Sequence, residues 1–221
     1  MFKDMVDVYN RNLIGILLLM LFIIFPITSF IFIAIIQFSI EFEGNLSVFF
    51  LGYSLLFNFI ICLPPFLWLT LRDFEDERAG LKECLTFFAT QFGPLLFTSF
   101  LFYTLAIYTS WMMMVPTIVL LLFTIIYPFF SDYPSIKEMF VQAKNKIIEE
   151  NIAIVVDMII VVSVLLFLWA GMMFFIQNFN NNMLSYMLVR SLINMIIFPI
   201  LYIYLTIRYR QKKEDFSMIN I

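Results

Sequence analysis

Few residues in this 221-residue chain could do chemistry inside its long apolar runs. The exceptions with most polar character are Arg190, Asn194 and Asp157. A charge within a membrane span costs about 2.5–3.5 kcal/mol or more at the bilayer centre, so it is usually retained for a function. Two interpretations of Arg190 stay open. It reaches the interface as a structural residue, or it faces the helix bundle and binds a ligand or partner.

The spacing of these three residues limits how they can act together. Asn194 follows Arg190 by one helical turn and extends a polar strip on the same face. Asp157 belongs to the preceding span, near its opposite end. In a hydrocarbon core about 30 Å thick, the two charges would be more than about 10 Å apart along the membrane normal. The sequence therefore predicts no direct Arg190–Asp157 ion pair.

Enzymatic chemistry is not expected. The chain has no His, no carboxylate pair within a span, no Gly-rich phosphate loop and no metal-type spacing. Its net charge of −3 comes from acids that stand beside the basic residues, which does not indicate nucleic-acid binding. We expect a non-catalytic protein without a metal or cofactor.

Charged residues beside the apolar runs could instead bind a partner. The run from Arg72 to Arg78 is rich in acids, which an anionic inner leaflet would repel, and this favours a protein partner. The alternative is that the helices around these residues only anchor at the lipid headgroups. The candidate docking residues are Asp73, Glu75, Asp76, Glu77, Lys82, Glu83, Lys137 and Glu138.

The positions of the cations predict how the chain crosses the membrane. Twelve of its thirteen Lys and Arg residues fall in four short stretches, at 1–11, 72–90, 132–150 and 208–221. Short exported loops lack Lys and Arg, so these stretches are expected to be cytoplasmic. The chain is therefore expected to cross the cell membrane an even number of times, with both termini in the cytoplasm.

The fold class predicted is an all-α polytopic membrane protein forming a single domain. The chain is 63% hydrophobic and 19% aromatic, more apolar surface than a soluble domain of this size could bury. Divided into segments of about 20 residues, it gives six transmembrane helices. They are expected at 12–38, 47–71, 91–109, 111–130, 152–176 and 184–207.

A short phrase, apolar-Lys-acid-apolar, precedes each odd-numbered span. It starts at Phe2, Leu81 and Ile136, and apolar residues continue from it at helical spacing. We predict cytoplasmic amphipathic helices at 2–11, 80–90 and 135–148, with Ser135 and Glu138 as a capping box. The chain would then contain three repeats, each an amphipathic helix followed by a hairpin of two spans.

Prolines mark candidate kinks in the spans, because each removes a helical hydrogen bond. The candidates are Pro26, Pro64, Pro65 and Pro199. The adjacent pair, Pro64 and Pro65, could break its span.

One stretch carries a family resemblance. Leu63-Pro64-Pro65-Phe66-Leu67-Trp68-Leu69-Thr70-Leu71-Arg72 is followed by an acidic turn and by Leu85-Thr86-Phe87-Phe88. With Asn12-Leu13-Ile14 and Tyr127-Pro128, it resembles the small YesL-type membrane proteins of Gram-positive bacteria. It departs from them in the bulky Pro65-Phe66-Leu67-Trp68. The resemblance implies a non-catalytic membrane protein associated with ABC-type carbohydrate uptake.

Three functions therefore stay open. The first is an accessory or scaffold subunit of an ABC-type transporter. The second is a six-span permease subunit of an ABC exporter for a lipid-like or apolar peptide substrate, powered by a separate ATPase. The third is a bacteriocin immunity or sensor protein. The scarcity of polar residues in the spans favours the first. Expected partners are the lipid bilayer and transporter components but no nucleic acid, and homo-oligomerisation is left open.

Overall fold

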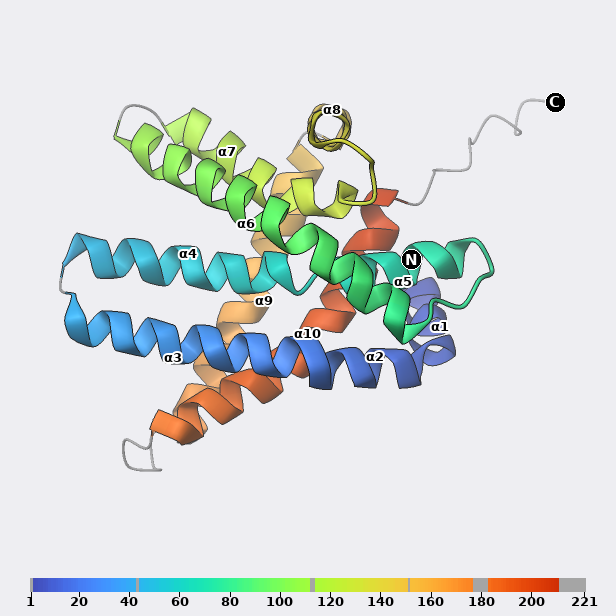
Figure 1. The fold of residues 1–221 in the computed structure, drawn as a ribbon. Helices are drawn as coiled ribbons and strands as arrows, with labels where there is room; N and C mark the ends of the chain where they lie inside the picture. Colours follow the sequence, from blue (N-terminus) through green and yellow to red (C-terminus); the bar gives the residue numbers. More distant parts are fainter. Residues whose placement is uncertain (1, 43, 112–113, 151, 177–182, 211–221) are drawn as a thin grey trace.

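The computed structural model describes residues 2–42, 44–111, 114–150, 152–176 and 183–210, and every regular element within them is a helix (Figure 1). Five helical segments are long and apolar enough to cross a membrane. They are Leu13–Glu41, Asn45–Phe74, Leu81–Ser110, Ile152–Met172 and Leu184–Arg210. The all-α class is confirmed, and by helix length and composition the chain is a membrane protein.

The first hairpin is introduced by α1 (Phe2–Arg11) and interrupted on both arms. The first arm consists of α2 (Leu13–Leu19), the π-helical turn η1 (Met20–Ile24) and α3 (Phe25–Glu41). The second arm consists of α4 (Asn45–Ile61) and α5 (Pro64–Phe74). Gly44 turns the chain between the arms with a φ of 78°, a conformation that glycine adopts without the penalty of a Cβ atom.

Prolines explain both interruptions. Pro26, the second residue of α3, has no N–H to donate to the preceding turn, and the wider π-helical turn η1 ends two residues before it, at Ile24. The Pro64 and Pro65 pair lies at the first two positions of α5, where missing donors cost least, and α4 has already ended at Ile61. Pro199 lies inside α10, which continues past it without a change of helix type.

The second hairpin pairs α6 (Leu81–Ser110) with α7 (Met114–Ile126) and the 3₁₀ turn η2 (Tyr127–Phe130). A separate amphipathic helix at 80–90 was expected, but α6 runs without a break from Leu81 through that segment and the expected span at 91–109. Pro94 lies within it without ending it, and Thr98 Oγ1 donates to the Pro94 carbonyl at 2.8 Å. One long helix therefore replaces two expected elements.

The third hairpin pairs α9 (Ile152–Ile176) with α10 (Met183–Arg210), and α8 (Ile136–Glu150) precedes it. The predicted cap of α8 is present, because the Glu138 backbone N–H donates to Ser135 Oγ at 3.2 Å. In Figure 1, α9 and α10 cross the α3–α4 hairpin at a steep angle. Separate amphipathic helices thus precede the first and third hairpins, as α1 and α8.

The core lies around α10, which packs against α1, α3, α5 and α9. Tyr202 is fully buried there, and its hydroxyl donates to the Phe59 carbonyl at 2.6 Å. The rings of Phe59, Phe66 and Phe198 each lie 5.0–5.5 Å from the Tyr202 ring, between centroids. Aromatic contacts of this kind join α4, α5 and α10.

Candidate functional site

Arg190 lies on α10 between two neighbouring helices. Its guanidinium carbon is 4.6 Å from the ring centre of Phe32 on α3 and 5.3 Å from that of Trp169 on α9. Both distances fit cation–π attraction, which contributes about 0.5–2 kcal/mol depending on desolvation. The side chain is half-buried, and no acidic partner lies within ion-pair distance among the described residues.

Asn194 lies one turn further along the same helix face, as predicted, and is fully buried. Its Oδ1 accepts a hydrogen bond from Trp169 Nε1 at 3.3 Å, whereas its buried Nδ2 has no partner among the described residues. Beside it, the hydroxyls of Ser191 and Ser29 lie 3.0 Å apart. We call Ser29, Phe32, Trp169, Arg190, Ser191 and Asn194 the polar seam, because together they join α3, α9 and α10.

A second polar contact joins the two arms of the first hairpin. Thr28 Oγ1 donates to Asn58 Oδ1 at 3.2 Å, and both side chains are buried. Gln37 points to a different partner, since its Nε2 donates to Glu41 Oε1 at 2.6 Å on the exposed side. Thr28 and Asn58 thus pair across helices, whereas Gln37 pairs within its own helix.

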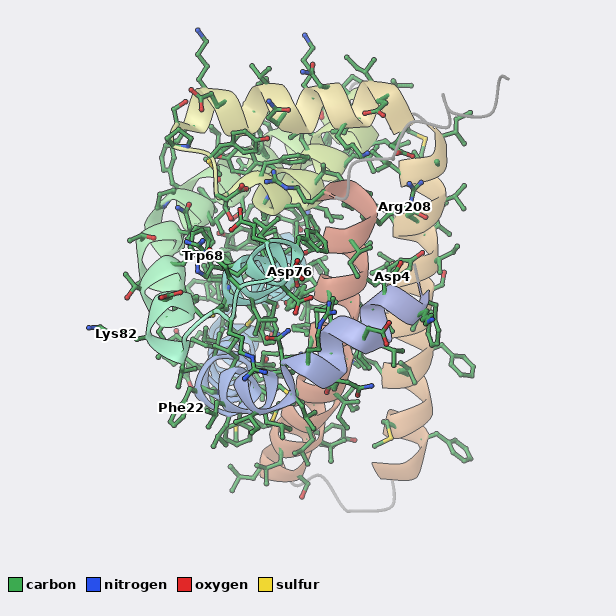
Figure 2. All side chains as sticks on the ribbon, turned by 90° about the vertical axis from the view of Figure 1, so that its right-hand side faces the viewer. Asp4, Phe22, Trp68, Asp76, Lys82 and Arg208 are labelled. Carbon is green, nitrogen blue, oxygen red and sulfur yellow. The ribbon has the colours of Figure 1, made fainter. Side chains whose placement is uncertain are left out.

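Asp157 pairs with Arg208 and not with Arg190. Arg208 Nε lies 3.3 Å from Asp157 Oδ2, and Arg208 also binds Glu150 at 2.8 Å. Lys146 reaches the same Glu150 carboxylate at 3.0 Å. Figure 2 shows Arg208 on α10 at the end of the molecule where α8 and α9 meet. This cluster ties the ends of α8, α9 and α10 together and was not predicted.

A neighbouring ion pair joins Arg210 of α10 to Asp132, which lies before α8. The Arg210 guanidinium also lies over the rings of Phe130 and Tyr133, at 5.2 Å and 5.0 Å. Burial raises the pKa of Asp132, and Arg210 only partly offsets this. The basic end of α10 is therefore fixed to the loop after η2.

Asp73 differs from the other acids of its run because it is buried. Both of its carboxylate oxygens bind the Arg11 guanidinium, and Oδ1 also accepts from Asn12 Nδ2 at 2.8 Å. The hydrogen bond to Asp73 raises the pKa of Arg11. Asp73 therefore holds α1 against α5 and is not free to meet a partner.

The other candidate docking residues lie at the surface. Glu75 and Glu77 are exposed and share Arg72, whose Nη1 lies 3.1 Å and 2.6 Å from their carboxylates. Arg72 in turn lies over the Trp68 ring at 4.7 Å. The remaining exposed candidates are Asp76, Lys82, Glu83, Lys137 and Glu138.

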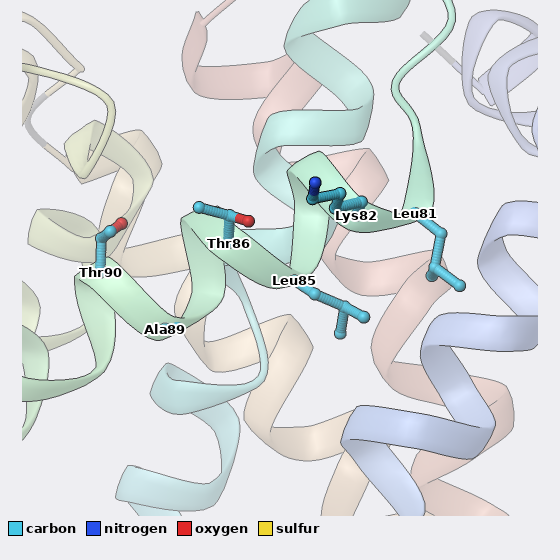
Figure 3. A pocket seen from close by; sticks show the side chains of 6 residues that line it. All are labelled: Leu81, Lys82, Leu85, Thr86, Ala89 and Thr90. Atoms are coloured by element: carbon cyan, nitrogen blue, oxygen red, sulfur yellow. The ribbon is translucent and has the colours of Figure 1, made fainter.

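A shallow hollow lies on the first turns of α6. Its lining comes from that one helix, as Figure 3 shows: Leu81, Lys82, Leu85, Thr86, Ala89 and Thr90. Figure 2 shows Lys82 extending away from the body of the molecule. A smaller polar hollow next to it includes Arg11, Asp76 and Glu77.

These arrangements connect helices through hydrogen bonds and charges. Within the described residues, no group of three or more His, Cys, Asp or Glu side chains could hold a metal ion. Sequence reasoning found Arg190 and Asn194 but missed Trp169, Ser29 and Ser191, because periodicity does not reveal which helices are neighbours. The sequence signal that could have found them is an aromatic or hydroxyl residue at the same membrane depth as Arg190 in a neighbouring span.

The fold and the polar seam define a helical membrane protein with polar side chains paired between its helices. No protein-family model, no curated protein and no solved structure matches this chain. The resemblance to the YesL-type proteins therefore stays a prediction.

Proposed function

We propose that this chain is a non-catalytic accessory or scaffold subunit of an ABC-type transporter, embedded in the cell membrane with both termini in the cytoplasm. The association with a transporter, and with carbohydrate uptake in particular, rests on the resemblance of the Leu63–Arg72 region to the YesL-type proteins. The scaffold role rests on the packing of the spans.

Six spans are part of this proposal. Five helices have the length required, and the sixth span would be Met114–Phe130. With the rise of an α-helix and a 3₁₀ turn, that segment is roughly 25–28 Å long, close to the thickness of a hydrocarbon core. It packs along α6 as the second arm of a hairpin. All twelve clustered cations then lie on the cytoplasmic side.

The observation that carries the scaffold role is that polar side chains of the spans pair across helices. Thr28 binds Asn58, Ser29 meets Ser191, and Trp169 binds Asn194. A permease would be expected to turn such groups toward a shared pathway for its substrate. Here Thr28–Asn58 and Trp169–Asn194 join the two arms of one hairpin, and Ser29–Ser191 joins the first hairpin to the third. Such pairing suits a rigid body that other subunits contact.

The cytoplasmic contact surface of the proposal consists of the exposed charges next to α5, on the first turns of α6, and on the first turn of α8, at Lys137 and Glu138. It excludes Asp73, which is buried against Arg11. It includes Glu75 and Glu77, whose side chains are 62% and 60% exposed. Charges exposed to that degree are available to a partner at little desolvation cost.

The test is purification of the tagged chain from its own membranes in mild detergent, followed by identification of the chains that accompany it. Recovery of a complete transporter is expected. The double charge reversal Glu75→Lys with Glu77→Lys should reduce that recovery. The matched control Glu149→Lys, at a side chain 63% exposed on the far end of α8, should not.

Two other results would contradict the scaffold role. Stoichiometric recovery of an ATPase with this chain alone would make it a permease. Recovery of no partner in several detergents would remove both transport functions and leave the immunity or sensor function.

A further inference from the structure

Arg190 is the one cation outside the four basic stretches, and no carboxylate of the described residues lies within ion-pair distance of it. Residues 177–182, which follow α9 in the sequence, include no Asp or Glu. Glu41 is the last residue of α3. Its side chain is exposed, and its carboxylate accepts a hydrogen bond from Gln37. A half-buried guanidinium without a carboxylate partner is costly in hydrocarbon unless an anion reaches it.

The contacts of Arg190 hold it in place without using its hydrogen bonds. Aromatic faces attract the charge, but they offer no oxygen lone pair to the five N–H donors of the guanidinium. Phe32 itself is buried, at 6% exposure, so this side of the contact is fixed. Trp169 is fixed by its bond to Asn194. The planar fork that binds phosphate in a bidentate manner therefore stays available.

The seam also has more donors than acceptors. Asn194 Oδ1 is taken by Trp169, and the buried Asn194 Nδ2 has no acceptor among the described residues. An excess of donors beside an unneutralised cation is the chemistry of an anion site.

The depth of Arg190 selects a lipid as the source of that anion. Arg190 comes seven residues after Met183, where α10 begins, so it lies at most about 10 Å along the helix from that end. An arginine at this depth extends toward the headgroups. Exposed apolar residues lie nearby on its own helix, at Leu188 and Leu192, and on α9, at Leu166. A ligand in contact with Arg190 would thus have its apolar part among lipid-facing side chains.

We propose that Arg190, held between Phe32 and Trp169, binds the phosphate of an anionic phospholipid in the outer leaflet. Trp169, Asn194, Ser29 and Ser191 are positioning residues that keep α3, α9 and α10 at the spacing the site requires. The site depends on the proposed topology but not on the identity of any cytoplasmic partner.

The test titrates the purified full-length protein with short-chain phosphatidylglycerol in neutral detergent and counts bound lipid by native mass spectrometry. Phosphatidylcholine, whose headgroup is neutral overall, and inorganic phosphate are the comparison probes. Wild-type protein should prefer phosphatidylglycerol, and Arg190→Gln should weaken that binding by about tenfold or more, because a charge-assisted hydrogen-bond pair is lost. The matched control Arg72→Gln removes a cation that Glu75 and Glu77 already neutralise, so its binding should equal wild type.

The variant Arg190→Lys keeps the experiment decisive if Arg190→Gln does not fold. It retains the charge but not the fork, so it should bind phosphatidylglycerol more weakly than wild type and more tightly than Arg190→Gln. Equal phosphatidylglycerol binding by wild type and both Arg190 variants would overturn the site. Inorganic phosphate binding as tightly as phosphatidylglycerol would overturn the lipid as its source. Neither result would alter which chains co-purify with the protein, so failure here is distinct from failure of the scaffold role.

Discussion

Aromatic rings hold three of the arginine side chains in this protein. Arg190 lies over Phe32 and Trp169, Arg72 over Trp68, and Arg210 over Phe130 and Tyr133. Arg72 and Arg210 also have carboxylate partners, whereas Arg190 relies on rings alone among the described residues. The presence or absence of a carboxylate partner therefore distinguishes the structural arginines, Arg72 and Arg210, from Arg190, which we propose binds a ligand.

Gly52 on α4 tests the packing of the first two hairpins. A Cβ atom at this position would collide with the hydroxyl of Tyr103 on α6, which is nearly buried and donates to the Phe49 carbonyl at 3.4 Å. We expect Gly52→Ala to destabilise the protein by about 1–3 kcal/mol through overpacking. Thermal unfolding in detergent measures this.

Two variants control that measurement. Gly93→Ala places a methyl group on α6 where no atom lies within 4 Å, so it should be neutral or stabilise by up to about 1 kcal/mol. Tyr103→Phe removes the colliding hydroxyl and should restore most of the stability lost in Gly52→Ala. A Gly52→Ala protein as stable as wild type would mean that α4 and α6 are not this close.

Asp73 should hold α1 in place through Arg11 and Asn12. Asp73→Asn removes the charge and should free the end of α1, so that trypsin cleaves after Arg11 several times faster. Asp76→Asn is the matched control, because Asp76 is exposed and has a φ of 57°, which Asn also tolerates. Equal cleavage rates in the two variants would show that α1 is held by its apolar contacts, Met5 and Val8, alone.

Helices were easier to predict than their boundaries. Apolar periodicity and Ser135 with Glu138 predicted α8, and the Pro64–Pro65 pair was a candidate kink at the point where α4 and α5 separate. The continuity of α6 was not predictable from the Lys82 and Glu83 charges, because an exposed first turn looks the same on a separate helix as on an extended one. The charges at the ends of α8 and α10 were visible in the sequence, but their pairing depends on how the hairpins cross.

The α8–α10 connection should respond to acid. Burial alone would raise the pKa of Glu150, but hydrogen bonds from Lys146 and Arg208 outweigh it, and the pKa falls below its ordinary value of 4.5. The folded state then binds fewer protons than the unfolded state near that pH. The stability from this cluster is complete above the unfolded pKa and is lost as pH falls through the folded one.

The measurement is the thermal midpoint in detergent from pH 6 to pH 3. Glu150→Gln should be less stable than wild type at pH 6, and the difference should shrink toward pH 3. Glu149→Gln, at a side chain 63% exposed and 4.0 Å from Lys146, should follow the wild-type curve. A difference that stays constant with pH would show that Glu150 contributes packing and not charge.

At the scale of the whole molecule, the proposed topology links the scaffold role to the lipid site. Cation positions alone indicate which ends of the hairpins are cytoplasmic. In the structure, α5 and the start of α6 lie at the end of the molecule that also holds α1, whereas α8 lies along α7 (Figures 1 and 2). Arg190 then lies on the opposite side of the membrane from every other cation. Met114–Phe130 is the shortest of the six proposed crossings.

Labelling of single introduced thiols in intact cells tests that topology most directly. The native thiols of Cys62 and Cys84 are buried, at 0% and 1% exposure, so wild-type protein gives the blank. A membrane-impermeant maleimide should label Ser110→Cys in intact cells, and Lys137→Cys only after the cells are permeabilised. If Ser110→Cys is protected until permeabilisation, α7 does not return the chain to the cytoplasm from outside, and the six-span arrangement is wrong.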